Sequence, residues 1–107
     1  MSRHDRARLD DIAAALAAVE AHRRRGDLTD GLVFDAVRVR LIEIGEAVKG
    51  LSSETTSEAP EIPWTDVARM RDFLAHRYFD TSHSVVAHTV DHDLPVLSSA
   101  VERLRRG

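Results

Sequence analysis

Apolar residues recur every three or four positions along most of this chain, and that spacing constrains the fold more than any other feature. A period of about 3.6 residues places such side chains on one face of an α-helix, whereas a half-buried strand needs strict alternation. The sequence shows no strand-like alternation and no internal repeat. The pattern therefore predicts an all-α protein, an antiparallel bundle of four to five helices packed on their apolar faces.

Glycines mark where the first two helices should end. The first helix is predicted over about residues 5–25, with arginines in its last turn and Gly26 after it. A second helix, capped by Thr29 or Asp30, is expected to end before Gly50. These are the residue types that typically cap helices, and arginine suits the negative end of the helix dipole.

The second predicted helix is apolar on more than one side. Its main stripe consists of Phe34, Val37, Leu41, Ile44 and Val48. Further apolar residues on other sides are Leu32, Val33, Ala36, Val39, Ile42 and Ala47. A helix apolar this far round must be buried on more than one face, and we expect a second copy of the chain to provide the additional cover. Gly45 either permits close approach of another helix or merely weakens this one by up to ~1 kcal/mol.

The second half of the chain is predicted to hold a loop and two further helices. Residues 51–63 are rich in Ser, Thr, Glu and Pro, which is typical of a loop. A third helix should start near Trp64 and run towards His76, and residues 80–82 would cap the next helix. Pro95 falls inside that last helix and should kink or divide it, because proline lacks the backbone N–H.

Length and composition exclude several classes of protein. The chain has 107 residues, which predicts a single domain over residues 1–107. With no cysteine it has no disulfide, thiolate zinc site or cysteine nucleophile. No apolar run approaches the roughly 20 residues of a membrane span, and the polar N-terminus does not resemble a signal peptide, so we expect a cytoplasmic protein without membrane contact. A net charge of −3 argues against broad coating of nucleic acid but leaves room for a local basic site.

The residues most suited to chemistry lie close together in the third predicted helix and just beyond it. Arg71, His76 and Tyr78 form the pattern R-x4-H-x-Y. Histidine titrates near neutral pH and can give or take a proton. Arginine stays charged and can hold a phosphate with two hydrogen bonds, and a tyrosine hydroxyl can orient a substrate or accept a modifying group.

Helical geometry separates two of these side chains. At roughly 100° per residue, Tyr78 returns to within about 20° of Arg71, whereas His76 points about 140° away from Arg71. One undistorted helix therefore cannot aim Arg71 and His76 at the same phosphate. Either the helix unwinds near His76 or two chains share the site, and we favour a shared site because the second helix independently suggests a dimer.

A structural role is the alternative for the same residues. His76 would then be a polar helix terminus, Tyr78 would belong to the core, and Arg71 would pair with a carboxylate at an ordinary surface. The carboxylates within its reach are those of Asp66, Asp72 and Glu46.

The chain resembles the HEPN superfamily and, within it, the HepT-like ribonuclease toxins. Besides R-x4-H-x-Y, the segments that carry the resemblance are residues 44–47 (IGEA), 62–64 (IPW), 70–72 (MRD), 76–79 (HRYF) and 93–95 (DLP). The similarity extends from about residue 7 to residue 104, with the segments in the order found in that family.

The resemblance implies a helical homodimer with a cleft at the dimer interface and a metal-independent endoribonuclease activity that needs no cofactor. It implies that Arg71 and His76 are catalytic, with Asp72 in support. It also implies a type VII-like toxin–antitoxin module, in which an MNT-type nucleotidyltransferase antitoxin transfers AMP to Tyr78 and silences the toxin. RNA is the implied substrate.

Two other functions are compatible with the sequence. One is a non-catalytic HEPN module that binds a nucleotide or the nucleotidyltransferase, and the other is a helical dimerisation protein without a small-molecule site. In a toxin the copies of Arg71 and His76 should converge across a dimer axis and stay accessible, whereas in a plain bundle they would lie apart or be locked in ion pairs.

Other polar residues carry weaker signals. His88 and His92 are four residues apart, a spacing that can hold a metal, but they lie off the apolar stripe and are interpreted as part of a solvated face. Arg38 and Arg40 interrupt the apolar second helix, and they either line a basic cleft or pair with Glu43. The sequence does not assign a role to these histidines or to His83, which lies nearby.

Overall fold

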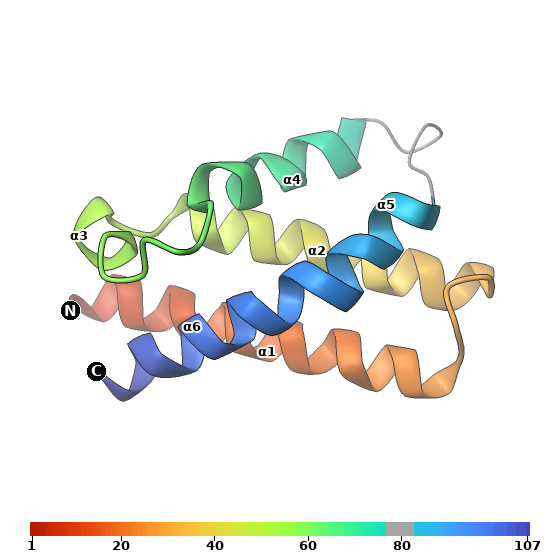
Figure 1. Ribbon diagram of the computed structural model, residues 1–107, viewed down its shortest axis with the longest axis horizontal. Coiled ribbons are helices and arrows are strands. Elements are labelled where there is room, and N and C mark those ends of the chain that lie inside the picture. The colour runs from red at the N-terminus through yellow and green to blue at the C-terminus, as the bar shows by residue number, and fades with distance from the viewer. Residues whose placement is uncertain (77–82) are drawn as a thin grey trace.

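The computed structural model describes residues 1–76 and 83–107, and this part of the chain contains helices and no strand (Figure 1). The elements are α1 (Arg3–Arg25), α2 (Gly31–Lys49), α3 (Ser53–Thr56), α4 (Trp64–His76), α5 (His83–His88), a π-helical turn η2 (Thr89–Asp93) and α6 (Leu94–Arg106). The all-α prediction is confirmed, and the long helices begin and end within a few residues of the predicted positions.

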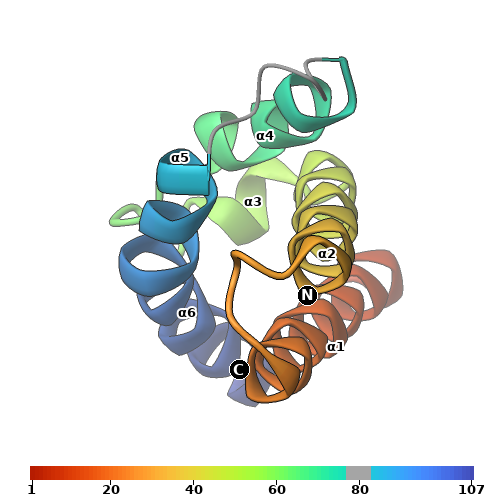
Figure 2. The same ribbon diagram turned by 90° about the vertical axis from the view of Figure 1, so that its right-hand side faces the viewer.

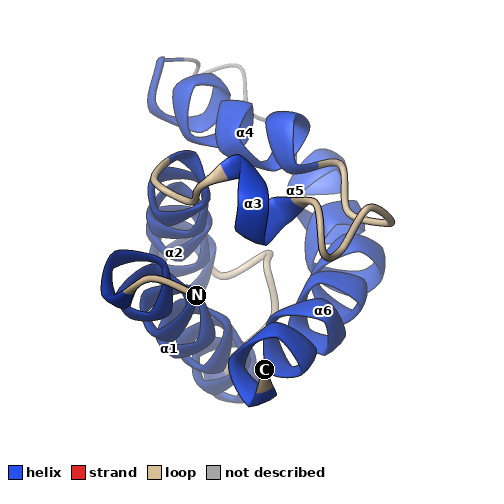
Figure 3. Ribbon diagram, turned by 90° about the vertical axis from the view of Figure 1, so that its left-hand side faces the viewer, coloured by secondary structure: helices blue, strands red, loops and turns tan. Residues whose placement is uncertain are grey.

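The helices form an antiparallel bundle. α1 and α2 run in opposite directions side by side, α4 packs on α2, and α6 returns along α1 (Figures 1 and 2). Viewed from its end, the bundle has its long helices arranged around a common interior (Figure 3). α3 lies at the same end as both termini.

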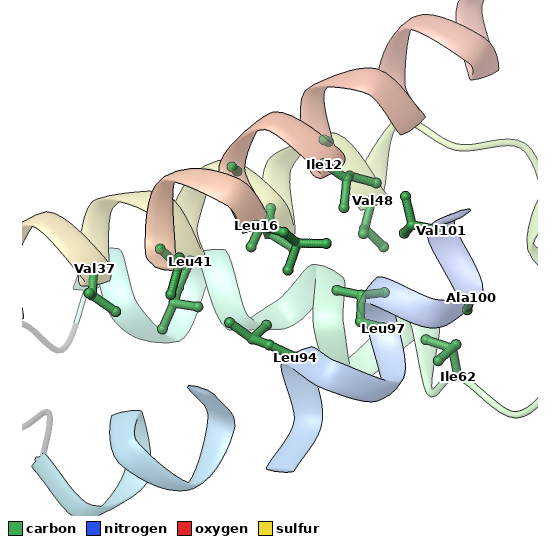
Figure 4. Packing of buried hydrophobic residues seen from close by; sticks show 14 of the residues in the cluster. Ile12, Leu16, Val37, Leu41, Val48, Ile62, Leu94, Leu97, Ala100 and Val101 are labelled. Carbon is green, nitrogen blue, oxygen red and sulfur yellow. The ribbon is translucent and has the colours of Figure 1, made fainter. Parts of the chain in front are cut away.

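The core consists of the apolar stripes that the sequence predicts. Figure 4 shows Leu16 of α1, Leu41 of α2 and Leu94 and Leu97 of α6 converging in the interior, and all four are buried. The predicted stripe of α2 is buried along its whole length. Burial of this apolar surface is the main favourable contribution to folding.

α2 obtains its cover from two helices of the same chain, α1 and α4. Among its larger apolar side chains only Leu32, 84% exposed, and Val39, 49% exposed, stay largely outside in the described structure. The expectation that α2 is buried on more than one face is confirmed. The need for a second copy to provide that burial is largely removed, because α4 takes this place.

The segment expected to be only a loop contains a short helix, α3, and a buried polar cluster. Asp5 of α1 is 2% exposed and accepts hydrogen bonds from the Ser52 backbone N–H at 3.0 Å, the Ser52 hydroxyl at 2.5 Å and the Thr55 hydroxyl at 2.6 Å. Hydrogen bonds from the Ser52 and Thr55 hydroxyls lower the pKa of Asp5. These hydrogen bonds connect the start of α1 to the segment that follows α2.

The last predicted helix is divided near Pro95, as expected. Pro95 lies in the first turn of α6, where its missing N–H costs no helical hydrogen bond. Directly before it, the Leu94 N–H donates to the Thr89 carbonyl five residues back, a π-helical hydrogen bond. In a continuous α-helix the proline ring would clash with the carbonyl of Asp91, and the wider turn relieves that clash.

Candidate functional site

α4 carries two of the predicted site residues and ends on a third. It is an unbroken α-helix from Trp64 to His76 that includes Arg71 and Asp72. Of its thirteen residues, all described, only Leu74 is buried. α4 lies at the edge of the bundle (Figure 2), so most of its surface is available to a ligand or a partner.

Gly45 lets α4 sit directly on α2. A Cβ atom placed at Gly45 would lie 2.9 Å from both the backbone N and the Cβ of Arg71, and 3.1 Å from the carbonyl O of Val67. These distances are shorter than van der Waals contact, so only glycine permits this approach. The close-approach interpretation of Gly45 is confirmed.

The carboxyl end of α4 is also held by α2. Arg38 donates from Nη1 to the Leu74 carbonyl at 2.7 Å. The last carbonyls of a helix lack helical partners and carry a partial negative charge, so a cation there is stabilising. Arg40, in contrast, pairs with Glu43 at 2.7 Å, so the two arginines take different roles.

Arg71 lies between two carboxylates. Its Nε is 2.5 Å from Oε2 of Glu46 on α2, and its Nη1 is 2.7 Å from Oδ1 of Asp72. The Arg71 side chain nevertheless remains 37% exposed. It borders a hollow of about 530 Å³. Residues of α1 and α2 line this hollow, among them Arg8 and Arg40. Pairing with carboxylates is what the structural alternative predicts, whereas the remaining exposure leaves the guanidinium accessible to a ligand.

His76 is the exposed last residue of α4. Because the α-helix extends to His76 without unwinding, the angular separation of about 140° from Arg71 holds along its length. One described chain therefore does not bring these two side chains together. Tyr78 lies outside the described residues, as does the predicted cap at residues 80–82.

A second hollow, of about 620 Å³, runs between α4 and the η2–α6 segment. Phe73, 41% exposed, and Val96, 53% exposed, line it together with Met70. The hollow is largely apolar. It gives α4 an apolar flank on the side away from Arg71.

Three histidines of the α5 and η2 segments form ring contacts. The rings of His88 and His92 have their centroids 4.6 Å apart, and His83 stacks on Phe34 at 4.2 Å. Residues 1–76 and 83–107 contain no group of three or more histidines and acidic residues placed to hold a metal ion. None of the described helices is long and apolar enough to cross a membrane.

Sequence reasoning missed the structural role of one residue at this site. Arg38 stood out only as a cation in an apolar helix, and its contact with the Leu74 carbonyl joins positions 36 residues apart. Glu46 was one of three carboxylates that the sequence offered as partners of Arg71, and the sequence did not choose among them. No spacing along one helix marks these two positions, because both contacts join α2 to α4.

Fold and site together define an all-α bundle whose edge helix displays an arginine and a histidine at its surface. The chain belongs to the HepT-like ribonuclease family, whose model, described as "Ribonuclease HepT-like", matches residues 9–104.

Relatives agree with this assignment. A protein of Thermococcus cleftensis named "Probable ribonuclease HepT" is 37% identical over 99% of this chain and 100% of its own length. A protein of Caldanaerobacter subterraneus, named as a candidate RNase, is 37% identical over 73% of this chain and 70% of its own length. One of Methanocaldococcus jannaschii with a similar name is 34% identical over 64% of this chain and 65% of its own length. No solved structure matches the chain.

Proposed function

We propose that this protein is a metal-independent endoribonuclease and the toxin of a two-component toxin–antitoxin module. The observation that carries the proposal is membership of the HepT-like ribonuclease family, supported by a relative of matching length named as a ribonuclease. The partly exposed Arg71 and the exposed His76 on the edge helix are the groups that such a reaction needs. RNA is the substrate, and the cytoplasm is the compartment in which we expect it to act.

In the proposed reaction, His76 takes the proton of an RNA 2′-hydroxyl as that oxygen attacks the adjacent phosphate. The bond from the 2′ oxygen to phosphorus forms, the bond to the 5′ oxygen breaks, and an acid returns a proton to the 5′ oxygen. Arg71 stabilises the negative charge that develops on the phosphoryl oxygens. The nucleophile lies within the substrate, so the reaction needs positioning rather than a metal-activated water.

A homodimer completes the proposed site. Because Arg71 and His76 point in different directions on one regular helix, the proposed site combines Arg71 of one chain with His76 of the other. The edge helix α4, which exposes His76 and leaves the Arg71 side chain 37% exposed, provides a surface for that association. Two-fold symmetry then gives two equivalent composite sites.

Mixing two inactive variants tests the composite site. Arg71→Ala and His76→Ala should each be inactive alone. After co-refolding, about half of the dimers are mixed and each has one intact site, so about a quarter of wild-type cleavage should return. His76→Ala refolded alone under the same conditions is the control. Absence of recovery in demonstrated mixed dimers would contradict a site shared between chains.

Regulation is the second part of the proposal. An MNT-type nucleotidyltransferase antitoxin would transfer AMP to Tyr78. The added phosphate places negative charge where the RNA phosphate must bind, and the nucleotide fills the cleft. Asp72, paired with Arg71, is the supporting residue.

A non-catalytic nucleotide-binding or antitoxin-binding module is the second candidate function, and one observation favours it. Arg71 is paired with two carboxylates, as expected for a residue that does not act on a substrate. Incubation of purified protein with labelled RNA separates the two functions. A toxin cleaves the RNA in the presence of EDTA, whereas a binding module leaves it intact.

A further inference from the structure

We propose that Glu46 is a positioning residue, which fixes the guanidinium of Arg71 so that its terminal nitrogens meet the substrate phosphate. The inference deepens the proposed function and rests on it. α2 makes two contacts with Arg71, one with its backbone through Gly45 and one with its side chain through Glu46.

The backbone of Arg71 is set by α2. A Cβ atom at Gly45 would lie 2.9 Å from the Arg71 backbone N, so α4 rests on α2 at this residue. The Cα of Arg71 therefore cannot move towards α2. What remains free along this long side chain is the direction of the guanidinium.

Glu46 restricts that direction. Its Oε2 lies 2.5 Å from Nε of Arg71, and it belongs to a different helix. Asp72 also contacts Arg71, but it is the next residue on α4 and moves with it. Of the two carboxylates, only Glu46 ties the guanidinium to the rest of the bundle.

Part of the guanidinium remains available to a phosphate. Of the five N–H groups of Arg71, one on Nη1 is donated to Asp72 at 2.7 Å, which leaves the second N–H of Nη1 and both of Nη2. Glu46 engages Nε, the nitrogen nearest the side-chain stem, whereas a phosphate is commonly bound through two parallel N–H groups. A guanidinium held at Nε presents its terminal nitrogens in a fixed plane. Misplacement of such a group by about 1 Å can cost 100-fold in rate.

Glu46 would have the opposite role if its negative charge competed with the substrate phosphate for Arg71. Two substitutions separate the roles. Glu46→Gln keeps the length of the side chain but removes the negative charge of the ion pair, whereas Glu46→Ala removes both the charge and the side chain. Positioning by the ion pair predicts a loss of kcat in both variants, of about 10- to 100-fold for Glu46→Ala. Competition predicts that both variants cleave faster than wild type.

Glu43→Ala is the matched control. Glu43 lies one turn earlier on α2, pairs with Arg40 at 2.7 Å and is 48% exposed, against 58% for Glu46. Its loss should leave kcat unchanged. Equal effects of Glu43→Ala and Glu46→Ala would reduce the role of Glu46 to general surface charge and overturn the inference.

An NMR measurement makes the inference independent of activity. The order parameter of the Arg71 Nε–H group, assigned through Arg71→Lys, should be high in the wild type and should fall in Glu46→Ala. An ordered Arg71 Nε–H group in a wild type that does not cleave RNA would contradict the proposed function and leave the positioning of Arg71 by Glu46 established. An order parameter unaffected by Glu46→Ala, or equal kcat in an active wild type and Glu46→Ala, would overturn the inference.

Discussion

Gly45 of α2 and Arg71 of α4 are in such close contact that a Cβ atom on the glycine would lie 2.9 Å from the backbone N of the arginine. The position of the candidate phosphate-binding residue is thus decided by a residue that has no side chain. Together with the ion pair from Glu46 and the hydrogen bond from Arg38 to Leu74, this contact makes α2 the support of the candidate site.

Replacing Gly45 by alanine should push α4 away from α2. The nearest atoms are backbone, which cannot rotate aside, so we expect a loss of about 1–3 kcal/mol from overpacking, partly offset by up to ~1 kcal/mol of helix propensity. RNA cleavage should fall with the displacement of Arg71. Urea unfolding and a cleavage assay measure the two effects. Gly31→Ala is the control, because no atom lies within 4 Å of a Cβ there.

His76→Ala should abolish most activity and leave the fold intact. A positioned histidine contributes about 10²–10⁴-fold through proton transfer. Because His76 is exposed at the end of α4, its loss removes no core contact, and Tm should stay within the error of the measurement. His88→Ala, also at an exposed histidine, should cleave normally. Growth arrest and wild-type cleavage by His76→Ala would exclude the proposed role.

Tyr78→Phe should escape silencing by the antitoxin. Phenylalanine lacks the hydroxyl that would receive AMP, so coexpression with the nucleotidyltransferase should leave this variant at its unmodified mass. Wild type and His76→Ala, which keep Tyr78, should gain mass equal to AMP groups. Intact-mass spectrometry decides the question, and a wild-type mass without any AMP would count against this mode of regulation.

Asp5→Asn should destabilise the protein in a pH-dependent manner. The pKa of Asp5 is lowered by hydrogen bonds from the Ser52 and Thr55 hydroxyls. A folded-state pKa below the unfolded value, about 3.9, means that the charged carboxylate stabilises the fold above that pH and loses this effect as the pH falls through the folded-state pKa.

We therefore expect Asp5→Asn to lower the free energy of unfolding at pH 7 by about 1–3 kcal/mol, with the difference shrinking towards pH 2. Urea unfolding at several pH values provides the measurement. Asp11→Asn removes a carboxylate of α1 that is 60% exposed and pairs with Arg8 at 3.3 Å, and it should cost less than about 1 kcal/mol. A pH-independent effect of Asp5→Asn would show that the charge of Asp5 does not matter.

Much of the fold follows from local patterns. The boundaries of α1 and α2 coincide with capping residues and glycines, because these ends are decided by backbone groups within a few residues of each other. The division at Pro95 follows equally from one missing N–H and one steric clash. α3 was not predicted, because a helix of four residues has no apolar period and depends on the Ser52 cap and the buried Asp5.

The site was predictable only in its chemistry. The sequence by itself determined an all-α fold, the apolar stripes of the core and the residue types of R-x4-H-x-Y, since each depends on spacing along a single helix. Only the tertiary structure decided that α4 covers α2, that Glu46 rather than Asp66 reaches Arg71 from another part of the chain, and that Arg38 closes the end of α4. Those contacts join residues 25 to 36 positions apart, and no periodicity fixes how two helices meet.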